Sequence, residues 1–228
     1  MPVTTSQPRF ELYAFWRSSA TYRVRVALNL KGLVAHERFV NLDAGEQRSA
    51  ELLAINPLGA IPALIDREAP PGSAPLLQSL AILEFLDEVQ PTPPLLPADA
   101  HGRARVRGIA AMLAGDTHPL VTPRVKKYLT TTGHLDDAAF RAWQVHWFTT
   151  GLQAVESALA SDGRTGRFAH GDTVTLADIC IASIFAVTRV FKIDVPAVPT
   201  LDRIMVACEL LEAFAQAAPS LQAGAPAA

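Results

Sequence analysis

The sequence has few cysteines: Cys180 and Cys208 are the only two among 228 residues. They lie far apart and lack the short CxxC spacing of a zinc site or a redox motif. Both fall inside apolar patterns with helical spacing, where a cysteine usually packs as a small hydrophobic residue. We therefore predict two buried free thiols, which fit a reducing compartment such as the cytoplasm.

Long hydrophobic runs are also missing. A helix that spans a bilayer needs about 20 apolar residues, and the richest stretch, Ile179 to Val187, is much shorter and contains Ser183. The opening segment MPVTTSQPRF lacks the apolar core of a signal peptide. These absences argue against a membrane protein and against export, and we expect a cytoplasmic protein.

No charge of one sign dominates the chain. Twenty Lys and Arg stand against 22 Asp and Glu, a formal charge of −2, so neither nucleic acid nor an anionic membrane is an expected partner. The sequence contains no P-loop, no GxGxxG, no HExxH and no histidine pair at metal-ligand spacing. No metal is expected. Half of the residues are apolar, which is enough for a sizeable core.

The first 90 residues alternate between strand and helix patterns. The strand patterns cover residues 11–16, 37–43, 61–65 and 76–77. The helix patterns cover about eleven residues before Gly32, then residues 47–54 and 79–89. The order is therefore β-α-β-α-β-β-α, with a parallel first pair followed by a hairpin. It predicts an α/β sandwich of thioredoxin type.

Proline marks a boundary after this first part. The segment PTPPLLPADAHG, which begins at Pro91, has four prolines in its first seven residues and is typical of a semi-rigid spacer. Only helical patterns follow, at residues 102–130, 137–160, 175–189 and 200–217. We expect an α/β domain at 10–90, a linker at 91–101 and an all-α domain at 102–220.

Two serine-containing junctions offer sites for an anion. Ser18 and Ser19 lie between the first strand and the first helix, and Gln78 and Ser79 open the third helix. A helix N-terminus has free N–H groups and a partial positive charge, which suit a thiolate or a carboxylate. The alternative at both junctions is an ordinary helix cap, which position alone favours.

Proline also begins the third strand pattern, at Ile61-Pro62. A cis bond there would turn a backbone N–H and C=O outward for a peptide ligand to pair with. The alternative is a proline on an edge strand, and the residues alone leave this open.

A capping-box pattern, Thr175-Leu176-Ala177-Asp178, precedes an apolar run and is interpreted as a folding signal. The charged residues on the first helix, Arg17, Arg23 and Arg25, are interpreted as solvated helix-face charges. His118 is interpreted as a packed or capping histidine. Arg124 can place positive charge over a cleft or lie on a solvated face.

Together these residues have a familiar order. The segments FWRSSATYRVRVALNLKG, INPLGAIPAL, LLQSLAILEFLDE, PLLPADAHGRARVR and GDTVTLADICIA resemble the zeta-class glutathione transferases, and among them the maleylacetoacetate and maleylpyruvate isomerases. The resemblance runs from about residue 11 to residue 219. It implies a thioredoxin-like N-terminal domain, an all-α C-terminal domain, glutathione as cofactor and a homodimer.

The resemblance also implies residue roles. It places Ser18, with Ser19 beside it, at the glutathione thiolate. It assigns glutathione binding to Gln47, Ile61, a cis Pro62, Gln78 and Ser79. It assigns the substrate to Arg17, His118, Arg124 and Arg189.

Some positions depart from the family pattern. Ala20 stands where the zeta class usually has a cysteine, which argues against a reductive dehalogenase. Val121 and Thr122 stand where relatives have a polar residue that contacts glutathione, Ser183 stands in place of a glutamine, and Val190 stands in place of an arginine. If these positions line the second pocket, we expect that pocket to be less polar.

The sequence therefore predicts a glutathione-dependent isomerase that acts on a small, electrophilic, anionic substrate by thiolate addition, bond rotation and elimination. One alternative is a transferase that conjugates glutathione to small electrophiles. Another is a non-catalytic binding module with the same fold.

Overall fold

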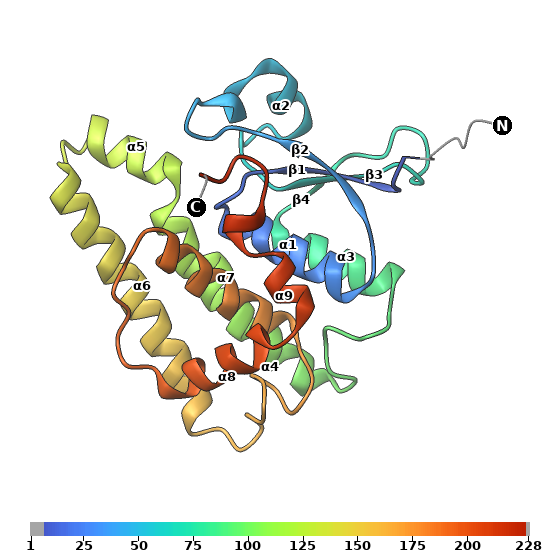
Figure 1. Ribbon diagram of the computed structural model, residues 1–228, viewed down its shortest axis with the longest axis vertical. Coiled ribbons are helices and arrows are strands. Elements are labelled where there is room, and N and C mark those ends of the chain that lie inside the picture. The colour runs from blue at the N-terminus through green and yellow to red at the C-terminus, as the bar shows by residue number, and fades with distance from the viewer. Residues whose placement is uncertain (1–6, 227–228) are drawn as a thin grey trace.

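The computed structural model describes residues 7–226. Residues 1–6 of the opening segment, on which the export prediction depends, lie outside this range. A four-stranded mixed sheet has the order β2-β1-β3-β4. Helices lie on both of its faces, and a larger group of helices packs against the helices on one of these faces (Figure 1).

The sheet confirms the predicted parallel pair and hairpin. Strand β1 (Phe10–Ala14) is parallel to β2 (Ala35–Phe39) and antiparallel to β3 (Ala63–Asp66). Strand β4 (Leu76–Leu77) pairs antiparallel with β3. The second strand was predicted to reach residue 43, but it ends at Phe39.

Asn41 explains this early end of β2. Its side-chain oxygen accepts hydrogen bonds from the backbone N–H groups of Asp43 and Ala44, at 3.0 and 3.2 Å. An asparagine that binds the backbone two or three residues further on forms a turn of its own. The chain therefore turns where the apolar pattern alone predicted more strand.

Three helices cover the sheet. Helix α1 (Ser19–Leu30) and helix α3 (Ser79–Val89) lie on the face that meets the helical part. A short turn (Glu46–Arg48) and helix α2 (Ala50–Ile55) lie on the other face (Figure 1). Under α2 a small separate apolar cluster forms from Tyr13, Val40, Leu52 and Ala63.

Up to residue 226, only helices and turns follow the sheet, as the sequence predicts. Their bounds are α4 Ala100–Ala111, α5 Pro123–Thr131, α6 Asp137–Ala160, α7 Leu176–Val190, α8 Pro199–Glu209 and α9 Glu212–Gln216. The thioredoxin-like α/β part and the all-helical part confirm the predicted fold class.

The prediction of one helix over residues 102–130 is wrong. Helix α4 ends at Ala111, and a π-type turn (Met112–Thr117) and a 3-10 turn (His118–Val121) precede α5. Pro123 provides the reason for the break before α5. The residue before a proline disfavours the α region, and that residue, Thr122, is extended at ψ 158°.

Helix α1 is the centre of the molecule. It packs against α3 of the α/β part and against α7 and α9 of the helical part (Figure 1). One continuous apolar core therefore includes residues of both parts, the first being Phe10 and the last Ala217. Because α1 is covered on every side, the prediction that Arg23 and Arg25 are solvated is wrong. Their residues are only 1% and 5% exposed.

The two cysteines are buried and free, which confirms the prediction made for them. Within residues 7–226, no helix is long and apolar enough to cross a membrane.

Candidate active site

Ser18 caps helix α1. Its hydroxyl oxygen accepts a hydrogen bond from the backbone N–H of Thr21 at 3.1 Å, and its backbone is extended as an N-cap requires. The cap uses the oxygen as an acceptor and leaves the hydroxyl proton free to donate. The cap and the thiolate-binding role are therefore compatible, because the contact that caps the start of the helix also holds the hydroxyl oxygen in place.

Ser19 has a different environment. It is 2% exposed, and its hydroxyl donates to the carbonyl oxygen of Ser183 on α7 at 3.0 Å. This proton is used inside the protein and is not directed to a ligand. Of the two serines, Ser18 is the one whose hydroxyl proton has no acceptor among residues 7–226.

Arg23 connects the two serine junctions. Its Nε donates to the hydroxyl of Ser79 at 2.9 Å, and one of its terminal nitrogens lies 3.4 Å from the hydroxyl of Ser19. The N-termini of α1 and α3 are thus joined through one buried guanidinium. Burial lowers the pKa of Arg23, yet an arginine stays protonated at neutral pH. Reasoning from sequence missed this residue.

Gln78 and Ser79 form the start of α3. Gln78 has φ 67°, a conformation that side-chain-bearing residues seldom adopt, and it makes no side-chain cap bond. Gln78 is exposed, whereas Ser79 is 6% exposed. Because no side chain caps α3, the free N–H groups of its first turn remain available to an anion.

The loop before β3 holds Ile61 outside the sheet ladder. The Ile61–Pro62 bond is cis, as the sequence analysis predicted. Asn56 is buried and fixes the loop: its side-chain nitrogen donates to the carbonyl of Ala60 at 2.7 Å. Residue pairing between β1 and β3 ends at Ala63, so the backbone of Ile61 takes no part in that ladder.

Gln47 lies against this same loop. A Cβ placed on Gly59 would come within 2.9 Å of the Gln47 carbonyl oxygen, and Gly59 has φ +59°. The side-chain oxygen of Gln47 is buried and has no hydrogen-bond partner among the described residues. A buried polar atom without a partner is costly, and a ligand N–H would satisfy it.

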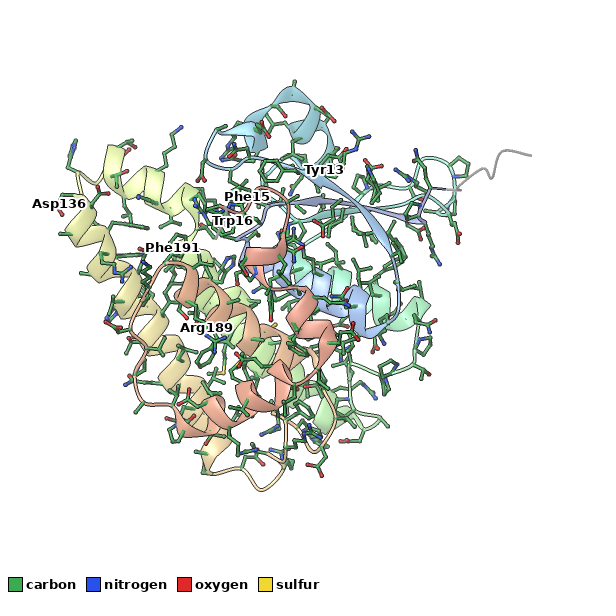
Figure 2. All side chains as sticks on the ribbon, in the orientation of Figure 1. Tyr13, Phe15, Trp16, Asp136, Arg189 and Phe191 are labelled. Atoms are coloured by element: carbon green, nitrogen blue, oxygen red, sulfur yellow. The ribbon has the colours of Figure 1, made fainter. Side chains whose placement is uncertain are left out.

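Arg17 lies in an aromatic environment. Its guanidinium carbon is 5.3 Å from the Phe15 ring centre, 5.4 Å from that of Trp16 and 5.5 Å from that of Phe191. Figure 2 shows Phe15 and Trp16 at the end of β1 and Phe191 just beyond α7. Arg17 also forms an ion pair with Asp43, so its charge is already shared.

The other predicted substrate arginines are less well placed. Arg189 pairs with Glu209 on α8, and its side chain is 61% exposed; it lies in the last turn of α7, just before Phe191. The ion pair directs the Arg189 side chain toward α8 and not toward Arg17 and its aromatic neighbours. Arg124 is exposed at the start of α5, and its charge acts on His118.

His118 begins the 3-10 turn before α5 and is half-buried. Burial, to which the charges of Arg23 and Arg124 add, lowers the pKa of its imidazole to about 3. The ring is therefore neutral at pH 7. It can donate one hydrogen bond to a ligand, but it cannot serve as a cationic anchor.

His118 should make the protein less stable in acid. The unfolded chain takes up a proton on this ring below about pH 6.5, whereas the folded chain does so only near pH 3. Stability is thus complete above pH 6.5 and is lost as the pH falls. We expect His118→Gln to reduce the slope of the unfolding free energy between pH 6 and 4, by up to about 1.4 kcal/mol per pH unit.

Urea unfolding at four pH values between 4 and 7 measures this slope. His36→Gln, which replaces an exposed histidine on β2, is the control and should leave the slope as it is. Equal slopes in wild type and His118→Gln would contradict the prediction.

The chain's own thiols are poor nucleophiles. Burial raises the pKa of Cys180 to about 11 and raises that of Cys208 as well, and only a thiolate is reactive. Among residues 7–226 no group of three or more His, Cys, Asp or Glu could hold a metal ion. Neither thiol of the chain is therefore suited to act as a nucleophile.

Ser183, one of the positions expected in a second pocket, does not line one. It is fully buried, accepts from Arg23 at 3.0 Å and donates to the Cys180 carbonyl at 2.7 Å. Val121 is 9% exposed and Thr122 is half-buried. A cavity of about 300 Å³ lies elsewhere, between β2 and α2, and none of the predicted site residues lines it.

A thioredoxin-like sheet with a cis-proline loop, two serine-led helix N-termini and a following helical part defines the glutathione transferase class. In agreement, residues 8–88 match the family model for the N-terminal domain of glutathione S-transferases. The maleylpyruvate isomerase of a Ralstonia species is 42% identical over 212 residues, which cover 93% of this chain and 98% of that protein.

Two solved structures are close to this fold. The maleylacetoacetate isomerase from Methylobacterium extorquens AM1, crystallised with bound malonate and glutathione, is 46% identical with a TM-score of 0.91, covering 95% of this chain and 100% of that one. A maleylpyruvate isomerase in its holo form, a bacterial zeta-class enzyme, is 41% identical with a TM-score of 0.88 and the same coverage. The chain belongs to the zeta class of glutathione transferases.

Proposed function

We propose that this protein is a glutathione-dependent cis–trans isomerase of a small dicarboxylic enone, of the maleylacetoacetate or maleylpyruvate type. The observation that carries the proposal is the pair of serine-led helix N-termini, with Ser18 at the start of α1 and Ser79 at the start of α3. Arg23 joins the two termini through its contacts with Ser19 and Ser79. Relatives above 40% identity that are maleylpyruvate and maleylacetoacetate isomerases support the substrate class.

The residues present fit glutathione. Gln78 and Ser79 hold its γ-glutamyl carboxylate at the uncapped start of α3. The backbone of Ile61 pairs with the cysteinyl part. Gln47 meets the glycyl end, where a peptide N–H satisfies its buried side-chain oxygen.

Ser18 keeps the bound sulfur ionised. A cysteine thiol has a reference pKa near 8.5, so at pH 7 most of it is protonated. The free hydroxyl proton of Ser18 and the positive end of α1 both favour the anion. Bound glutathione supplies the thiolate that adds to the cis double bond, permits rotation about the resulting single bond and leaves again.

Arg17 and Arg124 anchor the substrate carboxylates. Both are cations, and a guanidinium binds a carboxylate through two parallel hydrogen bonds. His118 contributes only as a neutral donor because its pKa is near 3. Arg189 is paired with Glu209, and Arg17 shares its charge with Asp43. Arg124 therefore holds one carboxylate firmly, and Arg17 holds the second more loosely.

Releasing Arg17 from Asp43 should improve substrate binding. Asp43 is mostly exposed and shares the charge of Arg17, so Asp43→Asn leaves the guanidinium free. An exposed ion pair contributes up to about 1 kcal/mol, and we expect KM for the anionic substrate to fall by roughly threefold with kcat little changed. Glu46→Gln, on the neighbouring turn, is the control in steady-state kinetics. A higher KM in Asp43→Asn would remove Arg17 from the substrate site.

Turnover of maleylacetone and maleylpyruvate, with and without glutathione, tests the function. Conjugation of 1-chloro-2,4-dinitrobenzene is measured in parallel. We expect isomerisation that requires glutathione, together with some conjugation because Val121 and Val190 make the pocket less polar. Arg124→Ala should impair isomerisation but not conjugation, while Lys127→Ala, an exposed cation on the same helix, should change neither.

The other outcomes favour the alternative functions. Conjugation without isomerisation would point to a transferase for apolar electrophiles. Failure to bind immobilised glutathione would point to a non-catalytic module. Isomerisation untouched by Arg124→Ala would show that the substrate lies elsewhere.

The assembly and compartment form a further part of the proposal. We infer a homodimer, to which the relatives' class points, and light scattering of the purified chain tests it. Free buried cysteines favour the reducing cytoplasm. We also propose a role in the breakdown of aromatic compounds, to which the proposed substrate class points. The domain limits 10–90 and 102–220, with a linker at 91–101, stay predictions.

A further inference from the structure

Arg23 carries a buried charge that no carboxylate neutralises. Its residue is 1% exposed, and its side chain reaches from α1 toward α3 and α7. Each of its hydrogen-bond partners is a serine hydroxyl: Ser79 at 2.9 Å, Ser183 at 3.0 Å and Ser19 at 3.4 Å. Within residues 7–226, no carboxylate oxygen comes within the 4.0 Å of an ion pair.

Two other buried cations, Arg25 on α1 and Lys31 directly after it, differ in this respect. Arg25 meets Glu37 through two contacts of 2.7 Å, and Lys31 meets Asp87 at 2.5 Å. A buried charge without a counter-charge is costly, and its partner hydroxyls offset only part of that cost. Arg23 is therefore a ready partner for an anion that reaches this place from outside the chain.

The hydroxyl protons show where that anion belongs. A guanidinium only donates, so each serine oxygen accepts from Arg23 and must send its own proton elsewhere. Ser19 donates to the Ser183 carbonyl, and Ser183 donates to the Cys180 carbonyl. Ser79 is the member of this group whose proton has no acceptor within residues 7–226. Ser79 is also the residue that opens α3.

We propose that Arg23 is the internal counter-charge for the γ-glutamyl carboxylate of glutathione and acts on it through the hydroxyl of Ser79. The inference rests on the proposed function, because it takes glutathione as the ligand. Arg23 is a positioning residue: it occupies the Ser79 oxygen, so that the Ser79 proton points to the carboxylate. Its charge and the N-terminus of α3 then attract the same anion.

Ser183 gains a role from this arrangement. It holds the same terminal nitrogen that approaches Ser19, and it lies on α7 of the helical part. The side chain of Arg23 is therefore fixed from both parts of the molecule. The contact with Arg23 explains why α7 has a polar residue, Ser183, at a fully buried position among apolar neighbours.

Two peptides test the proposal. One is glutathione, and the other carries 4-aminobutyryl in place of γ-glutamyl, so that it lacks only this carboxylate. Calorimetry gives both dissociation constants. In the wild type we expect the analogue to bind at least about tenfold more weakly, the effect of losing one charge-assisted hydrogen bond. In Arg23→Gln that ratio should fall below about threefold, because glutathione loses affinity and the analogue does not.

Arg25→Gln is the matched control. It makes the same change on the same helix at a buried cation whose charge Glu37 neutralises, and the ratio should stay at the wild-type value. Arg23→Lys keeps the charge and is the safer variant for folding; its ratio should fall less than in Arg23→Gln.

If both peptides bind more weakly to a folded Arg23 variant by the same factor, the ratio of their dissociation constants is unchanged. That result would mean that Arg23 only supports the structure. It would overturn this inference and leave the proposed function standing. A wild-type chain that binds neither peptide would overturn the proposed function as well.

Discussion

Ser18→Ala should lower the turnover number at saturating glutathione by about 100-fold or more, as loss of one donor to a reacting anion does elsewhere. The N–H of Thr21 fixes the Ser18 oxygen at 3.1 Å, and the hydroxyl proton can rotate toward a bound sulfur. Without the Ser18 hydroxyl, the pKa of the bound glutathione thiol is higher, so the thiol stays protonated up to a higher pH. The pH at which bound glutathione ionises, followed by thiolate absorbance, should rise together with the loss of turnover.

Two further variants separate chemistry from stability. Ser18→Thr keeps the hydroxyl and the cap and should restore most of the activity. Asp136→Ala removes another N-cap, at the outer end of α6 (Figure 2), where the carboxylate accepts from Ala139 at 2.8 Å. It should reduce stability by about 1 kcal/mol without changing turnover. Equal activity in wild type and Ser18→Ala would remove Ser18 from the catalytic site.

Asp178→Ala should lower the free energy of unfolding by about 3 kcal/mol or more. Asp178 is 0% exposed. One carboxylate oxygen accepts from the N–H of Ala169 at 2.7 Å, and the other accepts from the N–H and hydroxyl of Thr175, both at 2.8 Å. Alanine would leave these buried donors unpaired at the start of the most apolar helix, α7.

Urea unfolding gives the size of this effect. Asp178→Asn keeps the shape and one acceptor, so its loss should be smaller than that of Asp178→Ala. Asp136→Ala removes an exposed cap with one hydrogen bond, so its loss in free energy of unfolding shows what an ordinary cap contributes. A loss in Asp178→Ala no larger than in Asp136→Ala would show that the capping box adds nothing beyond a single cap.

Much of the fold follows from local patterns. The predicted bounds of β4 and α3 agree with the structure at Leu76–Leu77 and Ser79–Val89, because turn residues and a polar helix start lie directly beside the apolar runs. The prediction was less accurate where a side chain redirected the backbone, as Asn41 does after β2. It also missed the break before α5, although Pro119 and Pro123 are visible in the sequence.

The site was predictable in part. Resemblance and position both pointed to Ser18, and the structure shows how one hydroxyl serves as cap and as donor. The interpretation of Arg23 as solvated was wrong, yet its neighbours one helical turn ahead, Val26 and Ala27, already indicated an apolar surrounding. The pairing of Arg189 with Glu209 had no local indication, because the two residues lie on different helices.

By itself the sequence determined the order of strands and helices, the capped helix starts and the family, because apolar periodicity and caps act over a few neighbouring residues. Only the tertiary structure decided which charges are neutralised. Arg23 meets Ser79 and Ser183, which lie 56 and 160 residues away, and no carboxylate in the described chain. The state of a charge depends on every group that folding brings within a few ångströms of it, and that neighbourhood is formed by the packing of α1 between the sheet and the helical part.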